Sequence, residues 1–66
     1  MPHVGAQVTV EYLGFSAHGV VRHVADDGRH IEVETEDGRH ETFALNRATA
    51  TFTAGGGQTG ARLRFA

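Results

Sequence analysis

The chain has no cysteine, no lysine and a single proline. Without cysteine it forms neither a disulfide nor a thiolate zinc site, so nothing indicates a secreted disulfide scaffold and the redox compartment stays open. No apolar run is long enough to span a bilayer, and no basic segment precedes an apolar one as in a signal peptide. We therefore expect a cytoplasmic protein with no membrane contact.

The 66 residues suffice for one small domain, residues 1–66. A chain of this size buries only about 60% of the surface that its unfolded form exposes, so its stability is marginal without a metal ion or a partner subunit. Among its histidines, no pair has the spacing of a structural zinc motif. The five histidines are His3, His18, His23, His30 and His40. We expect no metal and no other cofactor.

Charge divides the chain unevenly although its net charge is only −2. Residues 1–41 hold all eight acids and three arginines, a balance of −5, whereas residues 42–66 hold three arginines and no acid, a balance of +3. Such asymmetry indicates an anionic partner or self-complementary association. Chance composition in a short chain also produces a split of this size.

Alternation of apolar and polar residues, the period of a β-strand, recurs along the chain, and no window shows a helical period. The alternating segments are VTVEY (8–12), HIEVETE (30–36), ATATFTA (48–54) and GARLRFA (60–66). On the inferred core face lie Tyr12, Phe43, Phe52 and Phe65, with the threonines at 49, 51 and 53 on an outer face. The pattern predicts an all-β protein.

The stretch DDGRH, residues 26–30, returns ten positions later as EDGRH, residues 36–40. Asp-Gly between two alternating runs is a strong hairpin signal, because glycine adopts the positive φ that tight turns require. The repeat therefore predicts the same turn chemistry twice. The strands that it joins are expected near 19–25, 30–35 and 40–45.

The side-chain period of two also predicts the length of the second turn. Ile31 and Phe43 point inward together only if that loop has an odd number of residues, which favours the three-residue loop Glu36-Asp37-Gly38 with Gly38 in the left-handed position of a bulge. The two turns then lie at opposite ends of the middle strand. This places His30 and His40 about 20 Å or more apart, too far to share one metal ion.

Several features of residues 4–46 occur together in one known type of barrel. They are a glycine before the first strand, a Gly-x-Val entry into the second, a further valine, and two Asp-Gly turns around an apolar strand: Gly5, Gly19, Val21, Val24, Asp27-Gly28, Ile31, Val33 and Asp37-Gly38. In these features the chain resembles the SH3-like small β-barrels of the Tudor and KOW kind. The resemblance implies an SH3-like barrel, and the strand pattern of residues 46–66 adds an extended C-terminal hairpin, so that five to six antiparallel strands are expected. Val21 and Val24 share the core of such a barrel only if a bulge falls between them.

The glycine-rich part of this hairpin has a second, local resemblance. FTAGGGQTG, residues 52–60, is similar to a hairpin in the archaeal seven-kilodalton chromatin proteins, which are SH3-like and bind the DNA minor groove. Those proteins are rich in lysine, which this chain lacks. The loop also lacks the Lys-Ser/Thr pair and the helix of a phosphate-binding loop, so we expect a hairpin tip.

Residues for catalysis are scarce. Ser16 and His18 stand two positions apart, but no acid partner or oxyanion loop accompanies them. Glu32, Glu34 and Glu36 lie on one face of a strand, as the solvated side of a sheet commonly does. We expect no enzyme activity, and a pocket built by oligomerisation is the remaining route to it.

The C-terminal hairpin offers a surface for an anionic partner. Arg62 and Arg64 lie two apart on one strand, about 6–7 Å from each other, near the spacing of successive phosphates in a nucleic-acid strand. Threonine hydroxyls on the neighbouring strand add hydrogen bonds to phosphate. The residues expected to bind are Arg47, Thr49, Thr51, Arg62 and Arg64, with Thr53 beside them. The alternative is that Arg62 and Arg64 pair with the three glutamates of the same barrel.

Two aromatic residues lie near the first turn. Phe15, expected in the loop LGFSAHG, and Tyr12 are candidates for stacking on a base or gripping a peptide, although Phe15 also suits the cover of an open barrel end. The leading hypothesis is a non-enzymatic module that binds nucleic acid, either RNA or a ribonucleoprotein surface. The alternative is a protein-interaction or assembly module, homo-oligomeric through the basic hairpin against the glutamate edge.

Overall fold

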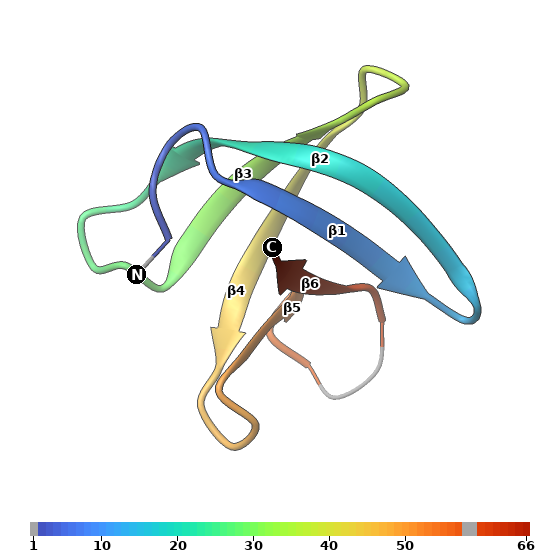
Figure 1. Ribbon diagram of the computed structural model, residues 1–66. Helices are drawn as coiled ribbons and strands as arrows, with labels where there is room; N and C mark the ends of the chain where they lie inside the picture. Colours follow the sequence, from blue (N-terminus) through green and yellow to red (C-terminus); the bar gives the residue numbers. More distant parts are fainter. Residues whose placement is uncertain (1, 58–59) are drawn as a thin grey trace.

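The computed structural model describes residues 2–57 and 60–66. They form six strands: β1 (Gln7–Tyr12), β2 (Phe15–Val24), β3 (His30–Thr35), β4 (His40–Asn46), β5 (Thr51–Ala54) and β6 (Arg62–Phe65). Each strand pairs antiparallel with the next and β6 pairs with β1, so the sheet closes on itself (Figure 1). The all-β prediction is confirmed: the fold is a small closed six-stranded antiparallel barrel, consistent with the SH3-like type.

The core of the barrel is one cluster of apolar side chains from all six strands. Its members are Val8, Val10, Val21, Ile31, Val33, Phe43, Phe52 and Leu63. Five of the eight are β-branched, which suits side chains that pack against a pleated sheet. In β1 and β3 buried residues alternate with less buried ones, as the sequence pattern predicts.

Strand β2 is ten residues long and bends where its pairing with β3 shifts by one residue. The shift falls between Val21 and His23 and marks a β-bulge. The extra residue shifts the alternation of the strand by one position, so that the side chain of Val24 points inward as that of Val21 does. Val21 is fully buried, and Val24 packs against the core. The bulge predicted between these two valines is confirmed.

The repeated Asp-Gly segments form two hairpin turns of unequal length. Between the backbone pairs that close them, the β2–β3 turn encloses four residues and the β3–β4 turn encloses three. Gly28 and Gly38 take the left-handed conformation, with φ of 70° and 85°. The three-residue loop pairs Ile31 with Phe43, and both are buried, so the predicted loop length is confirmed.

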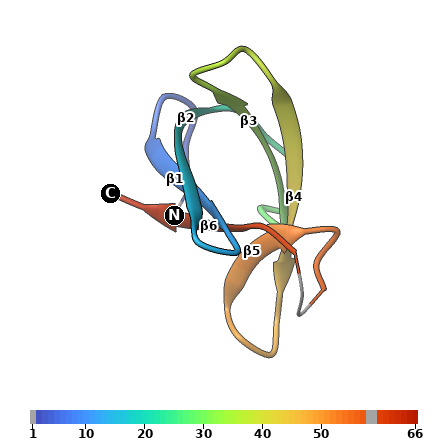
Figure 2. The same cartoon turned by 90° about the vertical axis from the view of Figure 1, so that its right-hand side faces the viewer.

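The C-terminal hairpin forms part of the barrel wall. Strands β5 and β6 have four residues each, and β6 pairs with β1 from Arg62 opposite Glu11 to Phe65 opposite Val8. Seen from the side, the end of the β1–β2 hairpin points toward the viewer in front of the C-terminal strands (Figure 2). Two residues of the predicted glycine-rich loop, at positions 58 and 59, lie outside the described residues.

The predicted strand over residues 48–54 is too long at its beginning. Ala48 and Ala50 lie in the turn before β5, where Ala50 has a φ of 55°. Thr53 was expected on the outer face, but it is buried and its hydroxyl donates a hydrogen bond to the Gly57 carbonyl at 2.9 Å. The outward alternation fails here because the following turn folds back over the end of this short strand.

Two aromatic side chains expected in the core lie at strand ends instead. Tyr12 is 48% exposed, because the end of β1 extends beyond the layer of core side chains. Phe65 is 41% exposed and meets the core through an edge-to-face contact with Phe52, with ring centroids 6.1 Å apart. Alternation gives the face of a residue on its strand but not how far the neighbouring strands extend to cover it.

Candidate functional site

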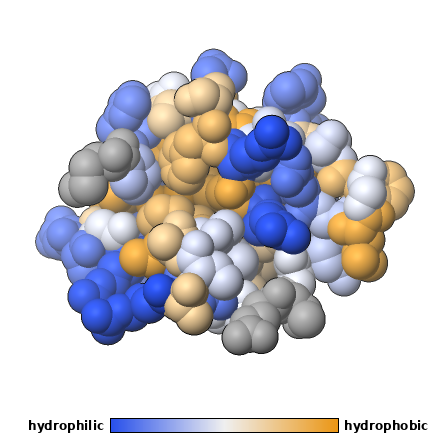
Figure 3. Space-filling model, turned by 60° about the horizontal axis from the view of Figure 1, so that its bottom comes forward, coloured by the Kyte–Doolittle hydropathy of each residue, from blue (hydrophilic) through white to orange (hydrophobic). Residues whose placement is uncertain are grey.

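A groove of about 880 Å³ opens at one end of the barrel, between the β1–β2 hairpin and the C-terminal strands. We call it the tip groove. One side is formed by residues 11–16, and the other by Asn46, the threonines at 49, 51 and 53, and Arg62. Figure 3 brings the lower side of Figure 1 forward and shows hydrophobic surface at its right-hand edge, where the β1–β2 hairpin ends.

The end of the β1–β2 hairpin, residues 12–15, is named the tip and carries apolar side chains in solvent. Tyr12 and Phe15 are cross-strand partners, and Leu13 and Gly14 between them have φ of 47° and 84°. Positive φ at both central positions is typical of a type I′ turn, in which Asn-Gly is favoured. Tyr12 is 48%, Leu13 82% and Phe15 79% exposed. Leucine in the left-handed region costs about 1 kcal/mol, so this turn combines backbone strain with unburied apolar surface.

Opposite the tip, a buried polar pair holds the start of the β5–β6 connection. The Nδ2 group of Asn46 donates a hydrogen bond to the Gly57 carbonyl at 3.1 Å, and the Thr53 hydroxyl donates to the same oxygen at 2.9 Å. The Oδ1 atom of Asn46 accepts from the backbone N–H of Ala48 at 3.0 Å. Buried polar groups destabilise a fold when they are unpaired, and these hydrogen bonds pair them. The same bonds hold the turn before β5 and the turn after it against the groove.

Charges at this end of the barrel are partly neutralised. Arg64 Nη1 lies 3.0 Å from Glu11 Oε2, which masks the acid at the edge of the groove. Arg62 lines the groove, and Arg47 lies in the adjoining turn. Neither of these two guanidinium groups makes an ion pair within residues 2–57 and 60–66.

The structure brings together five of the seven residues expected to bind. The five that line the tip groove are Tyr12, Phe15, Thr49, Thr51 and Arg62. Arg47 and Arg64 do not line it, and Phe15 begins β2 instead of lying in a loop. Leu13 and Asn46 were not anticipated, because an exposed leucine in a turn and a buried asparagine have no distinctive sequence pattern.

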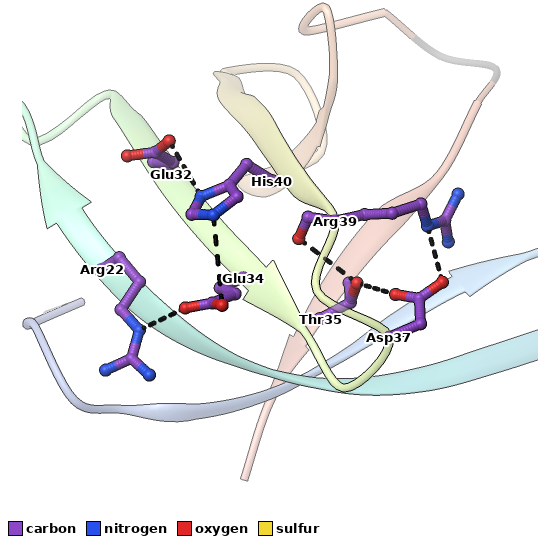
Figure 4. Close-up of polar contacts among 7 residues, drawn as sticks. All are labelled: Arg22, Glu32, Glu34, Thr35, Asp37, Arg39 and His40. Carbon is purple, nitrogen blue, oxygen red and sulfur yellow. Dashed lines mark hydrogen bonds and ion pairs between the residues drawn. The ribbon is translucent and has the colours of Figure 1, made fainter.

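The acidic face of β3 is engaged by residues of the neighbouring strands (Figure 4). Arg22 Nε lies 3.0 Å from Glu34 Oε1, and His40 Nδ1 lies 3.3 Å from Glu32 Oε2. All four side chains are substantially exposed, so each ion pair contributes little to stability. The alternative in which the arginines of β6 pair with these glutamates is therefore wrong, since Arg64 pairs with Glu11 instead.

The aspartates of the repeat act inside their own turns. The pKa of Asp27 lies below its ordinary value, chiefly because the backbone N–H of Arg29 donates to the carboxylate at 2.8 Å. The Thr35 hydroxyl donates to Asp37 and lowers the pKa of that carboxyl, with a smaller contribution from Arg39, whose Nε lies 2.9 Å from Oδ2. The interpretation of the repeat as turn chemistry is confirmed.

The histidines of the repeat lie on neighbouring strands at different heights. His40 pairs with Glu34, four residues along β3 from His30, which corresponds to about 13 Å along the strand. The predicted separation of about 20 Å is too large, although 13 Å is still beyond the span of one metal ion. In the part of the chain that the structure describes, no three potential ligands gather closely enough to hold a metal.

Among the residues described, no helix is long and apolar enough to cross a membrane. No protein-family model matches the chain, and no curated protein or solved structure is significantly similar to it. Tudor, KOW and chromatin proteins therefore remain resemblances of sequence pattern. The functional assignment depends on the barrel and on the tip groove.

Proposed function

We propose that this protein is a non-enzymatic binding module that holds a short stretch of single-stranded nucleic acid, such as RNA, in the tip groove. One observation carries the proposal: two exposed aromatic rings, two threonines and an arginine line the same groove. Aromatic platforms next to cationic and hydroxyl groups are the elements from which single-strand binding sites are built.

The aromatic side of the groove suits stacking. Tyr12 and Phe15 are cross-strand neighbours, so their side chains emerge on the same face of the hairpin. Each stacked base contributes about 1–3 kcal/mol when tested by substitution with alanine, and stacking tolerates any base. We therefore infer binding with little base preference.

The opposite side suits the sugar-phosphate backbone. Arg62 supplies a guanidinium group and Thr49 a hydroxyl donor, whereas the Thr51 hydroxyl donates to the Thr49 carbonyl at 3.1 Å and lines the groove beside them. Arg47 in the adjoining turn offers a second charge, whereas Arg64 serves to neutralise Glu11. The resemblance to Tudor and KOW barrels is compatible with this role.

The positive charge available at the groove sets the expected strength of nucleic-acid binding and its dependence on salt. If Arg47 and Arg62 each neutralise one phosphate, the logarithm of the binding constant falls by about 1.4 per tenfold rise in salt. Affinity then drops only about sevenfold between 50 and 200 mM salt, a shallow dependence. With a net charge of −2, the protein has no general attraction for nucleic acid. We infer weak, local binding at the groove.

An amide NMR titration with a short single-stranded RNA and a short DNA duplex tests the proposal at low and moderate salt. Saturable shifts at the tip, at Thr49, Thr51 and at Arg62, with RNA preferred, are the expected result. Phe15→Ala should weaken binding about tenfold, since loss of one stacked base is worth about 1.4 kcal/mol.

Charge-matched variants separate a local contact from a general effect of charge. Arg62→Gln should weaken RNA binding and reduce the salt slope by about 0.7, because one phosphate contact is lost. Arg39→Gln removes the same charge at the far β3–β4 turn and should change neither quantity. Absence of shifts at low salt, or equal losses in the two variants, would refute the proposal.

A further inference from the structure

Glu11 lines the tip groove and lies within reach of both arginines of β6. In the pairing of β1 with β6, Glu11 stands directly opposite Arg62. Arg64 stands opposite Thr9, so it is a diagonal neighbour of Glu11 on the same face of the sheet. Directly opposed side chains have Cβ atoms about 4.5–5.5 Å apart, and diagonal neighbours about 7–8 Å. By position alone, Arg62 is therefore the nearer partner for the Glu11 carboxylate.

The ion pair nevertheless forms with the more distant arginine. Arg64 Nη1 donates a hydrogen bond to Glu11 Oε2 at 3.0 Å. The guanidinium group of Arg62 makes no ion pair with the residues that the structure describes. Arg62 lines the groove and Arg64 does not, so the arginine with a free charge is the one that faces a ligand in the groove.

Two arginines and one carboxylate allow two alternative ion pairs, which leave different charges free. When Glu11 pairs with Arg64, the positive charge of Arg62 stays available inside the groove. When Glu11 pairs with Arg62, that charge is neutralised, and the free charge of Arg64 lies outside the groove. The side chains of Arg64 and Glu11 are 74% and 34% exposed, so their ion pair adds little to the stability of the barrel. We therefore expect the choice of partner to affect binding and not folding.

We propose that Arg64 is a positioning residue that holds the Glu11 carboxylate away from Arg62 and so keeps Arg62 free for phosphate. Without Arg64, the directly opposed Arg62 is the nearest cation of β6, and Glu11 pairs with it. A nucleic acid then competes with Glu11 for the same guanidinium group. The consequence for binding rests on the proposed function, whereas the exchange of ion-pair partners takes place in the free protein.

Titration of single-stranded RNA with Arg64→Gln at low salt tests the consequence for binding. Although Arg64 does not line the groove, its loss should weaken binding about threefold, because an exposed ion pair on Arg62 competes with phosphate only weakly. Glu11→Gln should restore the lost affinity in the Arg64→Gln chain and should strengthen binding less in the natural chain. Equal gains from Glu11→Gln in the two chains would show an effect of total charge alone and would overturn the proposal.

Two further chains separate positioning from direct contact and from general charge. If Arg64 acts through Arg62, Arg64→Gln should change binding little when Arg62 is already replaced by glutamine. The same threefold loss in that background would mean that Arg64 contacts the RNA itself, contrary to the proposal. Arg22→Gln is the matched control, since it breaks an ion pair of 3.0 Å with Glu34, of similar exposure, away from the groove. It should leave RNA binding unchanged.

NMR of the free protein tests the exchange of partners without nucleic acid. The Arg62 Nε–Hε signal should move further when Glu11→Gln is introduced into Arg64→Gln than when it is introduced into the natural chain, because only the first change removes an ion pair from Arg62. Equal displacements would overturn the proposal, whether or not RNA binds. A larger displacement in the Arg64→Gln chain, with no RNA binding by any of the chains, would confirm the exchange and refute the proposed function.

Discussion

Gly19 lies so close to β3 that a single added methyl group has no space. A Cβ atom there would lie 2.7 Å from Val33 Cγ1 and 3.0 Å from the Glu34 carbonyl oxygen. Val33 is fully buried and the carbonyl belongs to the backbone, so neither gives way easily. This glycine is required for packing and not for an unusual φ.

We predict that Gly19→Ala lowers the free energy of unfolding by about 2 kcal/mol, the typical cost of overpacking a core. Gly28→Ala is the matched control, since no atom lies within 4 Å of its added methyl group and only the φ of 70° opposes it. That strain is about 1 kcal/mol, partly offset by a stiffer unfolded chain. Urea unfolding of both variants measures the difference. Equal losses would show that the contact with Val33 is unimportant.

Residue-level sequence patterns indicate the side of a strand but not its depth. Ile31 and Phe43 are placed correctly because each has a paired strand on both sides, and the two residues pair with each other. Thr53 is placed wrongly because its burial comes from a turn that folds back over it. Tyr12 is placed wrongly because β1 runs one residue past its pairing with β6, which ends at Glu11. Such effects depend on strand length, which local alternation does not contain.

At the scale of the elements, the turns are stabilised by side chains within them. In the β3–β4 turn the Thr35 hydroxyl and Arg39 both contact Asp37 and favour its ionised form. A carboxyl whose pKa is lower in the folded state contributes stability above its unfolded pKa. That contribution disappears as the pH falls through the lower, folded pKa.

We predict that Asp37→Asn makes the barrel less stable at pH 7 and that the difference from the natural chain shrinks as the pH falls below about 4. Urea unfolding at a series of pH values measures the effect. Asp26→Asn is the control, because the Asp26 carboxylate makes no hydrogen bond or ion pair with the described part of the chain. A gap that stays constant between pH 7 and pH 3 would contradict the assigned role of the ionised carboxylate.

The bulge in β2 shows what element-level reasoning achieves. Two valines three positions apart cannot both face the core of a regular strand, so the sequence required an irregularity between them. The structure has it between Val21 and His23. The same side-chain parity predicts the length of the β3–β4 turn. It does not predict the length of the β2–β3 turn, because the bulge in β2 lies beside that turn and removes the parity constraint.

At the scale of the whole molecule, the tip groove joins segments far apart in the sequence. Tyr12 and Arg62 come together because β6 pairs with β1 and closes the barrel. Both residues were predicted as binding residues from the patterns of their own segments, but those patterns do not predict that the two line one cavity. Closure of the barrel brings the two residues together, and a local sequence motif does not contain that information.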